Sequence, residues 1–222
     1  MNTREIKLVI FDLDGTLLDT IEDLAAATNY ALEQESFSTH QVEAYRGFVG
    51  NGIKVLFEKA LGPDNASEEN VLKIQAHFKR YYSENGQSKT KPYEGVIAML
   101  CDLVESGVKV AIASNKYQEG VDSLVDVFFR DIPFVVALGQ REGVAKKPDP
   151  AIIYEILEKT EVSKDECLYV GDMDIDMNTA QAAGVKAVAV SWGFMDSRIL
   201  ETFSPYALID KPKELIDLIE KI

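Results

Sequence analysis

The sequence predicts an α/β fold: a doubly wound parallel sheet with an all-helical segment inserted after its first strand. Three observations support this prediction. Short apolar runs alternate with segments of helical periodicity, several of these runs stop on small or acidic polar residues, and residues 20–89 contain no convincing strand. Strands covered by helices on both faces have near-continuous apolar sequences, and strand–helix alternation is typical of parallel sheets.

The first strand is predicted in "KLVIFDLDGT", where Leu8–Phe11 is apolar on both faces. Asp12 and Asp14 follow where this strand stops, and Gly15 and Thr16 come directly after them. With a two-residue period, the two acids begin on the same side of the chain. Two carboxylates at the edge of a sheet therefore call for a chemical explanation.

Further strands and helices complete the predicted sheet. Strands are expected at Val108–Asn115, Phe134–Gly139, Cys167–Asp172 and Lys186–Gly193. One helix should begin near "PDP", with Asp149 as its cap and Pro150 in its first position. Gly184 should end another helix in a left-handed conformation, and Pro212 should open the last one. In such a fold the functional site lies at the carboxyl ends of the strands.

The inserted segment has helical periodicity only. Amphipathic helices are expected at 23–34, 41–48, 53–61 and 69–84, and the polar stretch "ENGQSKTKPYEG" suits a hinge that returns the chain to the sheet. We therefore expect a sheet-based core of residues 1–17 and 90–222 and a helical cap domain of residues 18–89. Insertions at this end of a sheet often act as lids.

Composition limits the classes of partner. The 222 residues are 46% hydrophobic, and 23 Lys and Arg against 37 Asp and Glu give a net charge of −14. Such a chain should repel nucleic acids and anionic membranes, so neither is expected as a partner. Two cysteines without metal-ligand spacing, no run of membrane-spanning length and no leader pattern predict a reduced, cytoplasmic protein. Monomer and homodimer both remain open.

Polar residues near the strand ends should converge at one edge of the sheet. They are Ser114 and Asn115 in "ASN", Lys147 in "VAKKPDP", and Asp172, Asp174 and Asp176 in "GDMDID", besides Asp12 and Asp14. Two unit charges 4 Å apart repel by roughly 4 kcal/mol at an effective dielectric near 20. Such a cluster of acids requires cations. A hard divalent ion with oxygen ligands, Mg²⁺ above all, and Lys147 would supply them, and the ion could accept a phosphate oxygen.

"DLDGT", "ASN", "KKPDP" and "GDMDID", in this order, resemble the four motifs of the haloacid-dehalogenase-like hydrolase superfamily, whose core is Rossmann-like. More narrowly, they are similar to its phosphatase branch with a helical cap inserted after the first motif. "RGFVGNGIKVLFEKALG", "SNK" and "SWGF" most resemble phosphoglycolate phosphatases. The resemblance covers nearly the whole chain.

The resemblance implies roles for individual residues. Asp12 would be the nucleophile that forms an aspartyl-phosphate, and Asp14 the acid and base that handles protons. The metal would be held by the carboxylates of Asp12 and Asp172 and the main-chain carbonyl of Asp14. Asp176 would act through water or by orienting Lys147, which screens Asp12 from the incoming dianion. Thr16, Ser114 and Asn115 would hold the phosphoryl group.

Some assignments stay open at this point. "KPDP" sets the register on Lys147, although Lys146 precedes it, and Asp174 is an extra acid that can remain solvated. The Gly50–Asn51–Gly52 turn suits a loop whose amides approach a ligand, so Gly50 and Asn51 are candidate substrate contacts. Lys116 is a candidate anion contact, as are Arg46 and Lys54, although solvated charges are the usual alternative.

The leading interpretation is a Mg²⁺-dependent phosphomonoesterase that acts on a small phosphorylated metabolite, with 2-phosphoglycolate as the first candidate. A phosphomutase of the β-phosphoglucomutase kind shares all four motifs, and pyrophosphate is another possible substrate. A dehalogenase is disfavoured because its chemistry needs neither Asp14 nor a metal. A phospho-acceptor signalling module is disfavoured by the long insertion and by the second acid two residues after the nucleophile.

Overall fold

The computed structural model of the chain describes residues 5–222. They form two compact units: one contains the chain up to Leu18 together with Pro92–Ile222, and the other is Asp19–Lys91. The first unit is built on a sheet and the second on helices. The points where the chain passes between them lie in two short paired strands, β2 (Leu18–Asp19) and β3 (Lys91–Pro92).

The sheet has six parallel strands in the order β5-β4-β1-β6-β7-β8. They are β1 (Leu8–Phe11), β4 (Lys109–Tyr117), β5 (Val136–Gln140), β6 (Cys167–Gly171), β7 (Lys186–Val190) and β8 (Ala207–Ile209). The chain starts in the middle of the sheet, fills one side through β4 and β5, and then fills the other side. The carboxyl end of β1, between β4 and β6, is therefore the topological switch point where ligands bind in such sheets.

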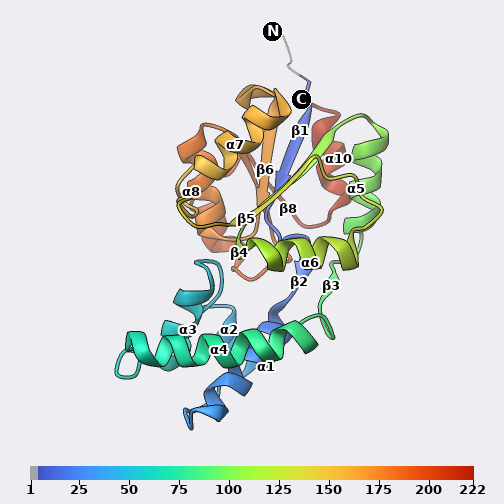
Figure 1. Cartoon of the computed structure of the whole chain (residues 1–222). Coiled ribbons are helices and arrows are strands. Elements are labelled where there is room, and N and C mark those ends of the chain that lie inside the picture. Colours follow the sequence, from blue (N-terminus) through green and yellow to red (C-terminus); the bar gives the residue numbers. More distant parts are fainter. Residues whose placement is uncertain (1–4) are drawn as a thin grey trace. The chain divides into compact units, whose positions relative to one another are not determined.

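Helices cover both faces of the sheet (Figure 1). Val9 and Phe11 point to the face covered by α5 (Val96–Glu105), α6 (Gln118–Phe128) and α10 (Lys213–Ile219), whereas Leu8 and Ile10 point to α7 (Ala151–Thr160) and α8 (Asp174–Ala183). The short helix α9 (Ser197–Glu201) packs on β7 through Leu200 and Ala189. All four residues of β1 are fully buried. The predicted doubly wound α/β fold is confirmed.

One strand and the start of one helix differ from the sequence prediction, whereas the end of another helix agrees with it. The sixth strand, β8, was not predicted, because its three residues at a sheet edge carry too short a pattern. Helix α7 begins at Ala151, one residue later than predicted; Pro150 precedes it, while the Asp149 carboxylate accepts a hydrogen bond from the Ala151 amide at 2.9 Å. Gly184 ends α8 with φ 70°, as predicted.

The helical unit contains α1 (Ile21–Gln34), α2 (Val42–Tyr45), α3 (Ile53–Leu61) and α4 (Glu68–Asn85). Residues 20–90, all of them described, contain no strand. Its core includes Phe57 and Phe78, whose ring centroids lie 5.2 Å apart. Helix α2 is shorter than the predicted 41–48, and Gly47, a poor helix former, follows it. The buried carboxylate of Asp23 accepts hydrogen bonds from the amides of Lys89 and Thr90, which anchors the returning segment on α1.

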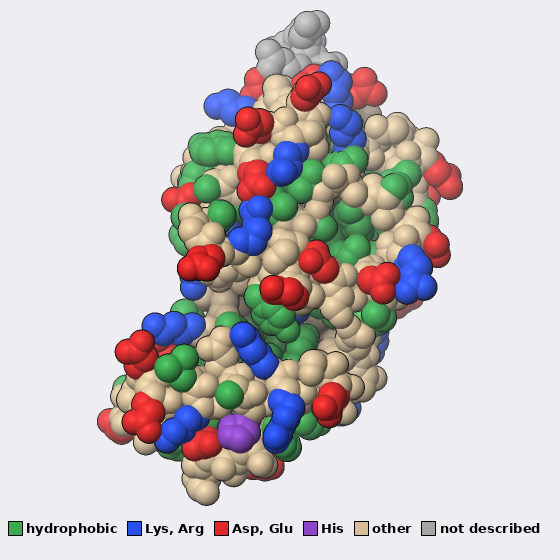
Figure 2. Space-filling model, in the orientation of Figure 1, with side chains coloured by type: hydrophobic (Ala, Val, Ile, Leu, Met, Phe, Trp, Pro, Cys, Tyr) green, Lys and Arg blue, Asp and Glu red, His purple; other side chains and the backbone are tan. Residues whose placement is uncertain are grey.

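Charges of both signs are interspersed on the face of the molecule seen in Figure 2, although the whole chain is acidic. None of the helices within residues 5–222 has both the length and the apolar character needed to cross a membrane.

Candidate active site

The turn after β1 places the first pair of acids. The Asp12 amide donates to the Val170 carbonyl of β6 at 2.9 Å, so the residue stays in register with the sheet although the strand has ended. Gly15 adopts φ 92°, and the amides of Leu17 and Leu18 both donate to the Leu13 carbonyl at 3.0 Å. This tight turn leaves the Asp12 side chain at the carboxyl end of β1, with only 7% of the residue exposed.

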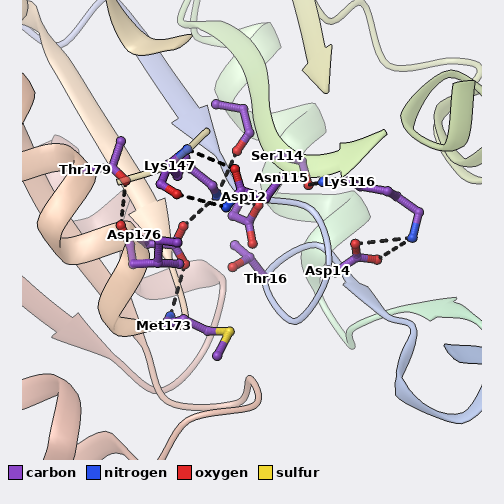
Figure 3. A network of polar contacts seen from close by, with 12 residues as sticks. Asp12, Asp14, Thr16, Ser114, Asn115, Lys116, Lys147, Met173, Asp176 and Thr179 are labelled. Atoms are coloured by element: carbon purple, nitrogen blue, oxygen red, sulfur yellow. Dashed lines mark hydrogen bonds and ion pairs between the residues drawn. The ribbon is translucent and has the colours of Figure 1, made fainter. Parts of the chain in front are cut away.

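Lys147 reaches Asp12 from a loop far along the chain (Figure 3). Its ammonium donates to Asp12 Oδ1 at 2.8 Å and to Asp176 Oδ1 at 2.7 Å. Asn115 fixes the lysine backbone, since its Oδ1 accepts from the Lys147 amide at 2.9 Å and its Nδ2 donates to the Lys147 carbonyl at 3.2 Å. Lys146 is exposed, so Lys147 is the lysine at the acids.

Asp172 and Asp176 complete a cluster with Asp12. One carboxylate oxygen from each residue lies within 4.8 Å of the others, and all three residues are buried. The carboxylate of Asp172, just after β6, accepts from the Thr16 hydroxyl and from the Phe194 amide, both at 2.8 Å. These hydrogen bonds hold each oxygen of Asp172 in a defined direction.

The cluster has more negative charge than Lys147 can compensate. Burial raises the pKa of Asp12 to about 7, although Lys147 opposes this shift. Burial also raises the pKa of Asp172 well above its usual value, and the charges of Asp176 and Asp12 add to the effect. Burial by itself would lower the pKa of Lys147, but Asp12 and Asp176 together raise it well above its usual value.

This donor set fits a hard divalent cation. The donor atoms are carboxylate oxygens, and Mg²⁺ prefers oxygen ligands over nitrogen or sulfur ligands. The pKa values of Asp12 and Asp172 are raised because buried negative charge is unfavourable. A bound cation would neutralise the same charge.

Glycines let the backbone approach these acids closely. A Cβ added at Gly15 or Gly193 would overlap the Asp172 side chain, and one at Gly171 would overlap Asp176. Gly193 lies in "SWGF", directly before the Phe194 amide that binds Asp172. The role of Gly193 and Phe194 was not predicted, because neither residue has a chemically active side chain and their position near Asp172 depends on the fold.

Other predicted site residues lie beside this cluster. The Asp14 carboxylate pairs with the Lys116 ammonium, with N–O distances of 3.2 and 3.3 Å, and points away from the Asp12 cluster in Figure 3. Ser114 accepts from the Lys116 amide at 3.2 Å, where the pairing of β4 with β5 becomes irregular between Ala113 and Tyr117. Asp174 is half-buried and accepts from the next amide, that of Ile175, at 2.8 Å.

Gly50 and Asn51 belong to the helical unit, in the connection between α2 and α3, where Gly50 has φ 100°. The sheet-based unit brings together Asp12, Lys147, Asp172, Asp176 and Thr16. Asn115 joins this group through its hydrogen bonds to the Lys147 backbone. Asp14 and Lys116 form a separate pair.

The sequence matches the family of haloacid dehalogenase-like hydrolases over residues 9–190, and the chain belongs to this family. Within the family it falls in the branch that resembles phosphoglycolate phosphatases. It is 32% identical over 222 residues to the phosphoglycolate phosphatase of Mesorhizobium japonicum, covering 97% of this chain and 96% of the relative. It is 36% identical to that of Pseudomonas syringae pv. tomato, covering 95% of this chain and 78% of the relative.

Solved structures place the chain in the same branch. A crystal structure of a candidate phosphoglycolate phosphatase from Lactobacillus delbrueckii subsp. bulgaricus has a TM-score of 0.92 at 33% identity, covering 97% of this chain and 98% of that one. The two folds therefore agree along almost their entire length.

Proposed function

We propose that this chain is a Mg²⁺-dependent phosphatase that hydrolyses a small phosphate monoester, with 2-phosphoglycolate as the leading candidate. The relatives named phosphoglycolate phosphatase support the substrate. The buried cluster of Asp12, Asp172 and Asp176, in which Lys147 donates to Asp12 and Asp176, is the observation that carries the mechanism. In this proposal the sheet-based unit is the catalytic core and the helical unit is its cap.

Asp12 would act as the nucleophile. Its carboxylate attacks the phosphorus atom, the ester P–O bond breaks, and the phosphoryl group is left on Asp12. Asp14 gives a proton to the leaving oxygen and then takes one from the water that attacks the aspartyl-phosphate. Inorganic phosphate leaves, and both carboxyl groups return to their starting state. Because Lys147 lies 2.8 Å from Asp12, it offsets the charge that an incoming phosphate dianion brings.

The carboxylates of Asp12 and Asp172 and the main-chain carbonyl of Asp14 would hold Mg²⁺. A bound Mg²⁺ would supply positive charge to offset the negative charge of the transferring phosphoryl group. Asp176 would not be a ligand in this assignment. Its Oδ1 accepts from Lys147 and Tyr169, and its Oδ2 accepts from the Met173 amide, so it serves to orient Lys147.

Residues around the nucleophile would bind the phosphoryl group. Ser114 and the backbone amide of Asn115 are the proposed contacts, with Lys116 nearby in its pair with Asp14. The Thr16 hydroxyl already donates to Asp172, so its contribution to phosphate binding would be indirect, through the position of that carboxylate. In the cap, Gly50 and Asn51 would contact the rest of the substrate.

A phosphate-release assay on a panel of small phosphate esters tests the proposal. We expect the highest kcat/KM with 2-phosphoglycolate, loss of activity with EDTA, and recovery with Mg²⁺. Asp12→Asn should lose at least ~10³-fold in kcat because the amide is a poor nucleophile. Full activity in EDTA or in Asp12→Asn would exclude this mechanism.

The same panel separates the rival functions. Isomerisation of a hexose phosphate without net phosphate release would identify a mutase, and preference for pyrophosphate a pyrophosphatase. A stable phosphorylated Asp12 without turnover would identify a phospho-acceptor module.

A further inference from the structure

Tyr169 places a hydroxyl group inside the otherwise apolar strand β6. The residue is fully buried, and its ring packs among Leu8, Ile10 and the other apolar residues between the sheet and helices α7 and α8. Its neighbours in the strand are Leu168 and Val170. A buried hydroxyl requires hydrogen-bond partners, and those of Tyr169 belong to the proposed site.

The tyrosine oxygen accepts a hydrogen bond from the Lys147 ammonium at 2.9 Å. Its own proton can be donated to Asp176 Oδ1, at 3.0 Å, or to the Ala113 carbonyl, at 3.3 Å. Lys147 also donates directly to Asp176 Oδ1 at 2.7 Å. Lys147, Tyr169 and Asp176 therefore form a closed triangle of hydrogen bonds.

The triangle affects how Lys147 is shared between two carboxylates. The ammonium has three protons, and its acceptors are Asp12, Asp176, the Tyr169 hydroxyl and the Ala113 carbonyl. Asp12 and Asp176 therefore compete for it. When Tyr169 donates its proton to Asp176 Oδ1, this carboxylate oxygen gains a second hydrogen-bond donor. The attraction between Asp176 and the Lys147 ammonium is then weaker. The tyrosine oxygen also occupies a position into which the ammonium could otherwise move.

We propose that Tyr169 is a positioning residue that keeps the Lys147 ammonium against Asp12 instead of allowing it to move toward Asp176. This inference rests on the proposed function, in which Asp12 is the nucleophile and Lys147 screens it. Tyr169 acts only through Lys147 and Asp176, because it has no contact with Asp12 among the hydrogen bonds of the described residues.

Tyr169→Phe removes the hydroxyl and keeps the ring. We expect kcat to fall about three- to tenfold, with KM changed less than about twofold, because the substrate contacts remain while the charge at Asp12 is less well compensated. In a crystal structure of the metal-free variant, Lys147 Nζ should lie beyond hydrogen-bond distance from Asp12 and remain bonded to Asp176. This structural readout does not depend on activity.

Thr160→Val is the matched control. It removes a buried hydroxyl that donates to the Ile156 carbonyl at 2.8 Å, at the end of α7 in the same unit. Both variants should lower Tm by a few degrees, since Thr160→Val loses one buried hydrogen bond and Tyr169→Phe loses the bond accepted from Lys147 and the bond that the hydroxyl donates. Thr160→Val should keep the wild-type kcat. Replacement of Tyr169 by para-aminophenylalanine keeps a polar atom at the place of the hydroxyl, so this variant should have a higher kcat than Tyr169→Phe. If Tyr169→Phe folds poorly, the kcat of this second variant relative to wild type tests the proposal.

The outcomes distinguish this inference from the proposed function. Wild-type protein that releases no phosphate from any ester would refute the proposed function, whereas the metal-free crystal structure would still test the position of Lys147. An unchanged kcat in Tyr169→Phe, or a lower kcat with the ammonium still bonded to Asp12, would overturn the positioning role. An equal loss of kcat in Thr160→Val would show that Tyr169 only stabilises the fold.

Discussion

Asp12 occupies an environment that is unfavourable for a charged carboxylate in the absence of a metal. It is buried, it lies near two other acids, and Lys147 is shared with Asp176. Its pKa is therefore raised from the ordinary 3.8 to about 7. A nucleophile must be ionised, so the same burial that excludes water also makes the site dependent on added positive charge.

The first prediction concerns stability and pH. Between its unfolded pKa, near 3.8, and its folded pKa, near 7, Asp12 binds more protons in the folded than in the unfolded state. The free energy of unfolding of metal-free protein should therefore fall as pH rises through this window, by up to roughly 4 kcal/mol from this group. Thermal unfolding in EDTA at a series of pH values measures this change in stability.

Mg²⁺ should reverse this trend, because metal binding requires deprotonated carboxylates. The rise in Tm on adding Mg²⁺ should be larger at about pH 8 than at about pH 5. In EDTA, the free energy of unfolding of Asp12→Asn should fall less than that of wild type as pH rises, because the variant lacks the Asp12 carboxyl group. A wild-type Tm in EDTA that increases across the window would contradict the raised pKa.

Asp14 supports a prediction about the two chemical steps. With p-nitrophenyl phosphate, whose leaving group needs no proton, Asp14→Asn should still phosphorylate Asp12 but hydrolyse the product ~10²–10⁴-fold more slowly. Intact-protein mass spectrometry after mixing should show a phosphoryl adduct. Asp174→Asn is the matched control, since Asp174 bonds to its own turn, and it should turn over normally. Rapid turnover in Asp14→Asn would remove Asp14 from the mechanism.

At the scale of elements, the site depends on how loops leave the sheet. The connections after β1, β6 and β7 bring Thr16, Asp172 and Phe194 into hydrogen-bond contact. The connections after β1 and β7 contain Gly15 and Gly193, and β6 itself ends on Gly171. A Cβ at any of these three glycines would overlap an acid of the cluster. The strands set the positions of the loops, and the small residues let the loops approach one another.

Gly193→Ala tests this close approach. The new Cβ has to displace the Asp172 side chain, so we expect the apparent affinity for Mg²⁺ to fall by about tenfold or more. The Mg²⁺ dependence of phosphate release and of Tm both measure it. Gly47→Ala is the control, because its Cβ would have only an ordinary contact, 3.5 Å from the Ala44 carbonyl. Wild-type Mg²⁺ affinity in Gly193→Ala would show that Asp172 is not a ligand.

At the scale of the whole molecule, two units divide the proposed function. The chemistry is assigned to the sheet-based unit, which contains Asp12, Lys147 and Asp172, whereas the helical unit contributes the Gly50–Asn51 turn. The acids of the cluster all lie in the sheet-based unit, so in the proposed function the helical unit serves as a cap that contributes no acid to the cluster. We therefore expect the choice of substrate to depend on the cap.

Asn51→Ala tests this division. If Asn51 hydrogen-bonds a charged substrate, its loss should lower kcat/KM for 2-phosphoglycolate about tenfold or more, and the loss should be smaller for p-nitrophenyl phosphate. Tm and Mg²⁺ affinity should not change. Asn85→Ala, at the end of α4, is the control in the same unit. Equal kinetics of Asn51→Ala and wild type on every ester would show that this turn does not contact the substrate.

Much of the fold could be predicted from local patterns. Leu8–Phe11 and Cys167–Gly171 are apolar runs long enough to identify buried strands, and the range of α3 was predicted residue by residue. Strand β8 could not be predicted, because three residues at an edge obtain their structure mainly from pairing with β7. Local sequence carries little of that long-range interaction.

The sequence by itself determined which side chains stand at the strand ends and in what order, because strand period and turn chemistry are local properties. It therefore predicted a larger group of eight residues at one sheet edge: Asp12, Asp14, Ser114, Asn115, Lys147, Asp172, Asp174 and Asp176. Asp12, Lys147, Asp172 and Asp176 lie together in the structure, whereas Asp14 pairs with Lys116 and Asp174 accepts from the Ile175 amide. Only the tertiary structure decided the partners: Lys116 with Asp14, Thr16 with Asp172, and Tyr169 with Lys147. These pairs are separated by 102, 156 and 22 positions, and strand order and loop approach, which no local pattern encodes, bring them within hydrogen-bond distance.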